Sequence, residues 1–197
     1  MISINPTEQT ERENYKLLIG SIIPRPIAFV TTHSEDGVLN GAPFSYFNIV
    51  SSNPPMVSLS IQHAGDKRKD TARNILDNKE FVVHIVDREN VEQVNQAAAN
   101  LPPEQSEISM AGFTPVDSLN VAVQGVKEAK VRMECILEHH AEFPGCDMFI
   151  GKVVQFHLDD RIYDQGRIDP GKLDAVSRLA GSSYATIGEL FSIERPR

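Results

Sequence analysis

The sequence predicts a mainly β protein, an antiparallel barrel with a few helices added to it. Many short segments are rich in β-branched and apolar residues, and clusters of turn residues separate them. Two segments show the start signals and the apolar spacing of a helix. Many strands with few helices favour an antiparallel barrel over a layered α/β fold. With 197 residues, 41% of them hydrophobic and 23% charged, the chain is long enough to bury the core of one domain.

The first predicted strands lie in the N-terminal third of the chain. Residues 27–32 are β-branched and apolar, and turn residues follow at 34–37. The chain then reads as one extended segment over 38–50, until Asn53-Pro54-Pro55 breaks it. In residues 56–62, apolar side chains alternate with Ser58 and Ser60, as in a strand with one buried face.

The next predicted strands form the middle of the sheet and a long hairpin. Residues 81–86 are apolar on both faces apart from His84, which is typical of a central strand. Residues 126–143 and 148–158 flank Pro144-Gly145, the signature of a type II turn. We therefore expect these two segments to pair as a hairpin.

Two helices are predicted between the strands. Asp70 can cap the first, whose apolar positions Ala72, Ile75 and Leu76 fall on one stripe. Asn90, with Gln93 three residues later, resembles a capping box at the start of the second. Residues 100–119 contain several prolines and a glycine, and we expect a long surface connection there, within the domain.

Two neighbouring segments could together hold a flat ring with a phosphate tail. Residues 40–48, NGAPFSYFN, present small and hydroxyl groups beside aromatic ones. Lys69-Asp70-Thr71 places a cation and a hydroxyl at a helix start, where free N–H groups and the positive end of the helix dipole favour a phosphate. We expect Asp70 to fix the loop, while Lys69, Thr71 and backbone N–H groups meet the anion. An ordinary helix cap is the alternative. A flat polar heterocycle with a phosphate tail describes FMN.

The order of these motifs closely resembles that of the flavin reductase-like family of FMN-binding split-barrel proteins: PRPIAFVTT, NGAPFSYFN, PP, SLSIQ and KDTARNI. The resemblance covers residues 15–196 of a single predicted domain, 1–197, and the tail reads Leu179-Ala180-Gly181 where Leu-Gly-Gly is common. It implies a Greek-key FMN-binding split β-barrel with a few flanking helices. It also implies a homodimer with the flavin near the subunit interface. The implied FMN contacts are Arg25, Thr31, Pro43, Phe44, Ser45, Tyr46, Asn48, Ser60, Ile61, Gln62, Lys69, Asp70 and Thr71.

Three of these residues have specific expected roles. The Ser45 hydroxyl and nearby backbone N–H groups should face the polar edge of the ring, where reduction places negative charge. Arg25, held between two prolines, could reach a phosphate or a partner subunit, or could be an exposed charge before a strand. Thr31 could line the ring or simply favour a strand.

Other familiar chemistries lack their motifs. The chain has no G-x-G-x-x-G, no Walker loop and no G-x-S-x-G elbow. Cys135, His139, His140 and Cys146 lie close in sequence, but ligands spread along a hairpin do not converge, so neither a metal site nor a disulfide follows. We name no catalytic side chain, because hydride transfer to a flavin needs no side-chain acid at the transferring centre.

The resemblance implies an FMN-dependent NAD(P)H:flavin oxidoreductase, which takes hydride from NADH or NADPH and passes reduced flavin to a monooxygenase component where one exists. The alternatives are an FMN-binding electron-transfer or sensing protein without nicotinamide turnover, and a flavin-free scaffold. A net charge of −8 disfavours nucleic-acid binding. The polar N-terminus, the lack of a membrane-length apolar run and the two cysteines predict a cytoplasmic protein away from membranes.

Overall fold

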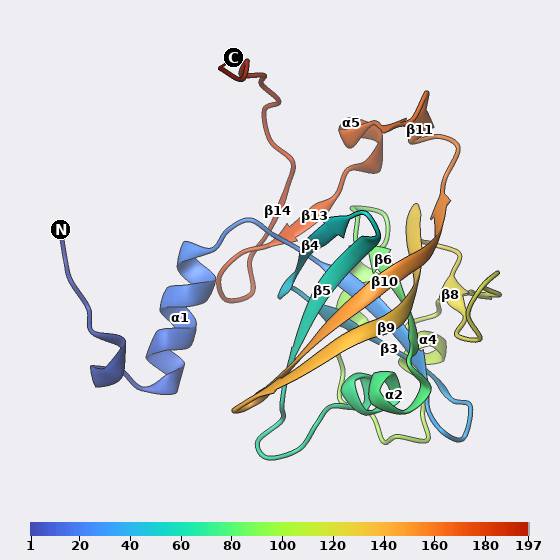
Figure 1. Cartoon of the computed structure of the whole chain (residues 1–197), viewed down its shortest axis with the longest axis horizontal. Coiled ribbons are helices and arrows are strands. Elements are labelled where there is room, and N and C mark those ends of the chain that lie inside the picture. The colour runs from blue at the N-terminus through green and yellow to red at the C-terminus, as the bar shows by residue number, and fades with distance from the viewer. Residues whose placement is uncertain (197) are drawn as a thin grey trace.

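Seven antiparallel strands form the main sheet of the computed structural model, which describes residues 1–196 (Figure 1). Strands make up 40% of the chain and helices 19%, so the mainly β prediction is confirmed. The order across the sheet is β3 (Leu39–Phe44), β2 (Ala28–His33), β6 (Glu80–Ile85), β9 (Val131–Phe143), β10 (Cys146–Leu158), β5 (Pro55–Gln62) and β4 (Phe47–Ser52).

The barrel closes at a corner that the sequence did not predict. Strands β3 and β4 follow each other along the chain, yet they lie at opposite edges of the sheet order. The chain therefore bends at residues 45–46 and passes from one edge to the other, which curls the sheet into the predicted split barrel. The single extended segment expected over 38–50 was wrong, because β3 pairs with β2 while β4 pairs with β5.

The other predicted strands are confirmed with shifted ends. In β5 the side chains of Val57, Leu59 and Ile61 are buried, as the alternation predicted. Strand β6 is central and packs on both faces, with Phe81 and Val83 in one apolar cluster and Val82 in the other. Strands β9 and β10 form the predicted hairpin around Gly145, whose φ of 76° is one that glycine adopts easily.

Core packing around β10 makes Gly151 intolerant of a side chain. A Cβ atom placed there would lie 2.3 Å from Cζ of Phe81, which is fully buried. We expect Gly151→Ala to lower the free energy of unfolding by at least about 1 kcal/mol, because a packed core resists added volume. Denaturant titration measures this, with Gly188→Ala as the control, since nothing lies within 4 Å of the Cβ position at Gly188. Equal stabilities of the two variants would contradict the packing described.

The two predicted helices exist, but their starts differ from the prediction. Helix α2 (Asp70–Asn78) has Lys69 at its N-cap, and Asp70 lies in the first turn with its carboxylate paired to Arg73. The expected cap by Asp70 was wrong, because the helix begins at Asp70 itself, one residue earlier than a capping Asp70 requires. Helix α3 (Val91–Gln96) does start after Asn90, but the expected capping box was wrong. The Asn90 side chain accepts from Asp87 N–H instead.

Three further helices and a short 3-10 turn, η1 (Pro6–Glu8), complete the helical part. Helix α1 (Glu11–Ser21) begins with a capping box between Thr10 and Glu13. Helix α4 (Glu107–Met110) and strand β7 (Pro115–Val116) lie inside the segment 100–119, which was expected to be an irregular connection. Helix α5 (Pro170–Leu173) follows β10. Of the helices within residues 1–196, none has the length and apolar character needed to cross a membrane.

Short strands link the chain ends to the barrel. Strands β1 (Arg25–Pro26), β13 (Val176–Arg178) and β14 (Tyr184–Thr186) form a small sheet in that order. Strand β7 pairs with β8 (Gly125–Val126), and β11 (Tyr163–Asp164) pairs with β12 (Arg167–Ile168).

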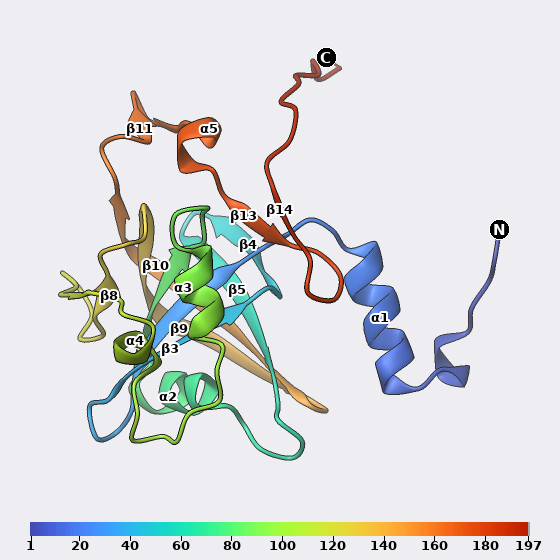
Figure 2. The same cartoon turned by 180° about the vertical axis from the view of Figure 1, so that it is seen from behind.

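Both ends of the chain reach away from the barrel, α1 at one side and the tail beyond β14 at another (Figures 1 and 2). Exposed apolar side chains lie on both segments: Leu17, Leu18, Ile22, Leu190, Phe191 and Ile193.

Candidate functional site

Two adjoining cavities lie beside the corner that closes the barrel. The first has a volume of about 390 Å³, and the second has a volume of about 320 Å³. Both are lined by Pro43, Phe44, Lys69 and Ala98, so they form one groove. Its walls come from parts of the chain that are far apart in sequence: α1, the β3–β4 corner, β5, the loop before α2, α3 with its following loop, and the β13–β14 turn.

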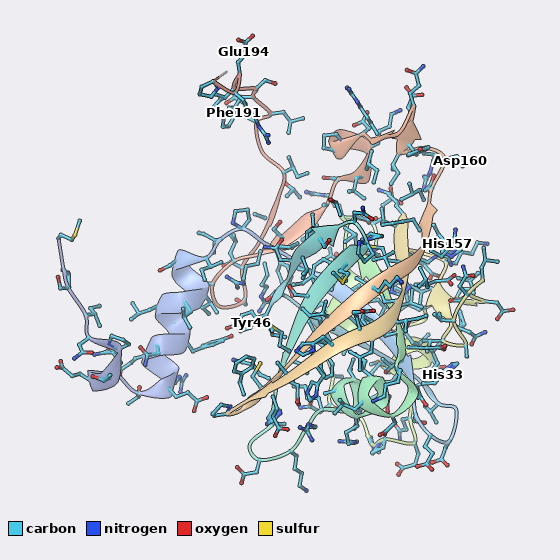
Figure 3. The ribbon with its side chains drawn as sticks, viewed as in Figure 1. His33, Tyr46, His157, Asp160, Phe191 and Glu194 are labelled. Atoms are coloured by element: carbon cyan, nitrogen blue, oxygen red, sulfur yellow. The ribbon has the colours of Figure 1, made fainter. Side chains whose placement is uncertain are left out.

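The first cavity has aromatic and hydroxyl side chains on its walls. Phe44 is almost fully buried, and Tyr46 lies between α1 and the barrel (Figure 3). Backbone N–H of Ser60 donates to the carbonyl of Tyr46 at 2.8 Å, which ties the corner to β5. Burial raises the pKa of the Tyr46 hydroxyl, Tyr15 adds to the rise and Arg25 opposes it. Tyr46 therefore stays a neutral hydroxyl at physiological pH.

Arg25 lies in the wall of the first cavity and is not an exposed charge. Its side chain is almost completely buried, so that alternative reading of the sequence was wrong. One terminal nitrogen donates to the carbonyls of Ile19 and Ile22 at 2.7 and 2.6 Å, and the other donates to Leu179 at 2.9 Å. The guanidinium thus holds the end of α1 and the β13–β14 turn against the cavity. Its predicted contact with a phosphate stays a prediction.

The second cavity carries the cations expected of an anion site. Lys67, Arg68, Lys69 and Arg73 line it, against the carboxylates of Asp70 and Glu107. Arg73 pairs with Asp70, and Arg68 pairs with Glu142 and Asp147. Among residues 1–196, Lys67 and Lys69 make no ion pair with a carboxylate. These two amines are therefore available to an anionic ligand.

Polar side chains at the floor of the second cavity form a chain of hydrogen bonds. The Thr71 hydroxyl donates to Asn40 Oδ1 at 3.3 Å, and Asn40 Nδ2 donates to Glu107 Oε2 at 2.7 Å. The same carboxylate oxygen accepts from Gly41 N–H at 3.3 Å. Burial raises the pKa of Glu107. The segment 100–119, whose role the sequence did not predict, thus supplies Glu107 to the floor of the groove.

Three predicted residues lie outside the groove. Ile61 is fully buried in the core, because successive side chains of a strand point to opposite faces and its neighbours Ser60 and Gln62 face the cavity. Thr31 is also buried, and its hydroxyl donates to the carbonyl of Gln124 at 2.7 Å. Asn48 is exposed on β4 and accepts from the backbone N–H of Ile49. The remaining ten line one cavity or both: Arg25, Pro43, Phe44, Ser45, Tyr46, Ser60, Gln62, Lys69, Asp70 and Thr71.

A buried carboxylate organises the cationic end of the groove. Asp147 is fully buried, and its two oxygens accept from His63, His140 and Arg68 at 2.6 to 3.1 Å. Burial acts to raise the pKa of Asp147, but the hydrogen bonds from Arg68, His140 and His63 outweigh it and lower the pKa to about 2. Asp147 is therefore ionised at neutral pH and holds Arg68 at the cavity wall.

Sequence reasoning missed the parts of the site that come from outside residues 25–75. Tyr15, Asn95, Arg178 and Tyr184 line the first cavity, and Glu107 lines the second. Arg178 and Tyr184 flank the tail segment Leu179-Ala180-Gly181 of the resemblance, but no role in the site was expected of them. Only the folded chain brings all five residues to the groove. His63 lines neither cavity, and its imidazole contacts the buried Asp147 instead.

Comparisons with known proteins agree with this architecture. Residues 19–172 match the profile of the Flavin reductase like domain. The uncharacterized protein YwrF of Bacillus subtilis (strain 168) is 49% identical in an alignment of 193 residues, and the match covers 94% of this chain and 94% of that protein. The crystal structure of nitrilotriacetate monooxygenase component B from Bacillus cereus is 54% identical, with a TM-score of 0.96 and 98% of each chain covered. The structure of the Pseudomonas fluorescens 2-nitrobenzoate 2-nitroreductase NbaA is 28% identical, with a TM-score of 0.91 over 99% of this chain and 96% of that one.

Proposed function

Because the chain belongs to the flavin reductase-like family, we propose that it binds FMN in the two joined cavities and transfers a hydride from NADH or NADPH to the bound flavin. The observation that carries this proposal is the shape and charge of the groove. An aromatic and hydroxyl-lined cavity adjoins one with two unpaired lysines, and these two parts match a flat ring and a phosphate. FMN is proposed over FAD because a single phosphate is enough for the two lysines of the second cavity.

The flavin, when bound, supplies the ring that accepts the hydride. In this proposal the residues of the chain bind and orient it. The β3–β4 corner, residues 43–46, lies along the ring with the Ser45 hydroxyl at its polar edge. Lys69 and Lys67 neutralise the phosphate at the start of α2, and Gln62 faces the ring cavity from β5. Positive charge and preset donors near the ring favour its reduced, negatively charged form.

We also propose that the protein is a cytoplasmic homodimer with the flavin near its interface. Residues of helix α1 and of the β13–β14 turn line the first cavity. Helix α1 and the tail beyond β14 also carry exposed apolar side chains, which a second copy of the chain would cover. Similarity to a monooxygenase component B supports a further step, in which reduced flavin passes to a monooxygenase partner.

Two measurements on the purified protein test the proposal. Flavin absorbance after addition of FMN tests binding, and steady oxidation of NADH or NADPH with FMN present tests hydride transfer. Flavin binding without nicotinamide oxidation would instead support an electron-transfer or sensing role. If the protein does not take up FMN, the result would instead support a flavin-free scaffold.

A further inference from the structure

The first cavity holds more positive charge than the proposed flavin phosphate uses. Three cationic residues line it, Arg25, Lys69 and Arg178, and of its described lining residues none is acidic. The protein as a whole carries a net charge of −8, so the lining of this cavity is cationic although the protein is acidic overall. Lys69 also lines the second cavity and serves the phosphate there. Arg25 and Arg178 remain without an assigned anion.

Arg178 is presented to this cavity by a small framework of contacts. It lies on β13 directly opposite Arg25 of β1. Its guanidinium carbon lies 4.5 Å from the centre of the Tyr184 ring, and Nη2 donates to the carbonyl of Gly181 at 2.6 Å. The Tyr184 hydroxyl in turn donates to Asn95 Oδ1 at 3.2 Å, which ties the turn to α3. The guanidinium is therefore held in place while Nε and Nη1 keep their N–H groups for a ligand.

Neither arginine has a counter-charge within the described chain. Across residues 1–196, no carboxylate forms an ion pair with Arg25 or Arg178. Arg25 is almost completely buried, its terminal nitrogens bind only carbonyls, and its Nε has no hydrogen-bond partner. A buried cation that lacks a counter-charge strengthens the attraction of the cavity for an anion. The half-buried Arg178 beside it is the group that a ligand in the cavity can reach.

We propose that Arg178 binds the diphosphate of the nicotinamide dinucleotide, the link that joins its two nucleosides. This rests on the proposed function, which places the flavin phosphate at Lys67 and Lys69. Arg178 lines the first cavity and not the second, so a different anion must reach it. A dinucleotide whose nicotinamide approaches the ring from this side brings its diphosphate past the β13–β14 turn. Because NADH and NADPH share the diphosphate, Arg178 acts on both alike.

Substitution of Arg178 in the FMN-loaded protein tests this assignment. We expect Arg178→Gln to raise KM for NADH and for NADPH by about 10-fold or more, because one charge-assisted hydrogen bond to a phosphate is lost. The affinity for FMN should stay within about twofold. Arg178→Lys should recover part of the loss, since it keeps the charge without the guanidinium fork. Arg167→Gln is the matched control, because Arg167 is exposed on β12 and lines neither cavity.

Binding of ADP-ribose gives a readout that does not depend on turnover. This probe carries the diphosphate without the nicotinamide, and calorimetry on FMN-loaded protein should show binding that Arg178→Gln weakens by the same factor as KM. Unchanged KM and unchanged ADP-ribose affinity in that variant would overturn the assignment. A parallel loss of FMN affinity would also overturn it, because Arg178 would then serve the flavin or the wall. If the unmodified protein binds FMN and ADP-ribose but oxidises neither nicotinamide, the proposed reaction fails while this site stands.

Discussion

Replacing Lys69 by alanine is expected to weaken FMN binding about 10- to 100-fold and to leave riboflavin binding almost unchanged. Lys69 lies at the start of α2, lines both cavities and has no carboxylate partner within residues 1–196. Only FMN carries a phosphate, and a charge-assisted hydrogen bond contributes about 1.5–3 kcal/mol. Nζ also lies 5.9 Å from the centre of the Phe44 ring, so a small effect shared by both flavins is expected from that contact.

Flavin fluorescence titration measures both affinities, and Lys152→Ala on the exposed face of β10 controls for the lost charge. Adding Thr71→Ala to Lys69→Ala should weaken FMN binding further. The Thr71 hydroxyl must turn from Asn40 to the phosphate to take part, so its share should be the smaller one. Equal weakening of FMN and riboflavin by Lys69→Ala would place the phosphate elsewhere.

The strands were predictable where the pattern was local. The alternation of Val57, Leu59 and Ile61 with serines marks β5 because one face of that strand is buried whatever its neighbours are. The corner at residues 45–46 was not predictable, because β3 and β4 both read as strand. Only their different partners, β2 and β5, decide where the chain must bend.

The residues of the candidate site also fall into those that a local pattern predicted and those that only the folded chain brings together. A lysine and a threonine at a helix start are a local signal, and the structure does place Lys69 and Thr71 in one cavity. Thr31 and Ile61 lie in two other motifs of the resemblance, PRPIAFVTT and SLSIQ, and their side chains are buried in the protein. Arg178 and Glu107 come from other parts of the chain, so no spacing in the sequence connects them with Lys69.

The buried carboxylate behind the cationic cavity should make the stability of the protein depend on acid pH. Asp147 has a pKa of about 2 in the folded protein, against 3.8 for the ordinary group. Its pKa is lowered by folding, so its contribution is fully present above the unfolded pKa and is lost as the pH falls through the folded pKa. The difference corresponds to about 2.5 kcal/mol at pH 7 and to about half of that at pH 3.

Asp147→Asn is therefore expected to lower the free energy of unfolding by about 2.5 kcal/mol at pH 7, and the gap to the unmodified protein should shrink as the pH falls toward 3. Denaturant titrations at several pH values between 7 and 3 measure it. Asp160→Asn is the matched control, since Asp160 is exposed near the far end of the barrel (Figure 3) and should cost little at any pH. A gap that stays constant with pH would mean that Asp147 contributes through packing and not through its charge. Asp147→Asn should also hold Arg68 less firmly at the cationic end of the groove, because Arg68 keeps only the exposed Glu142 as its ion-pair partner once the charge of Asp147 is removed.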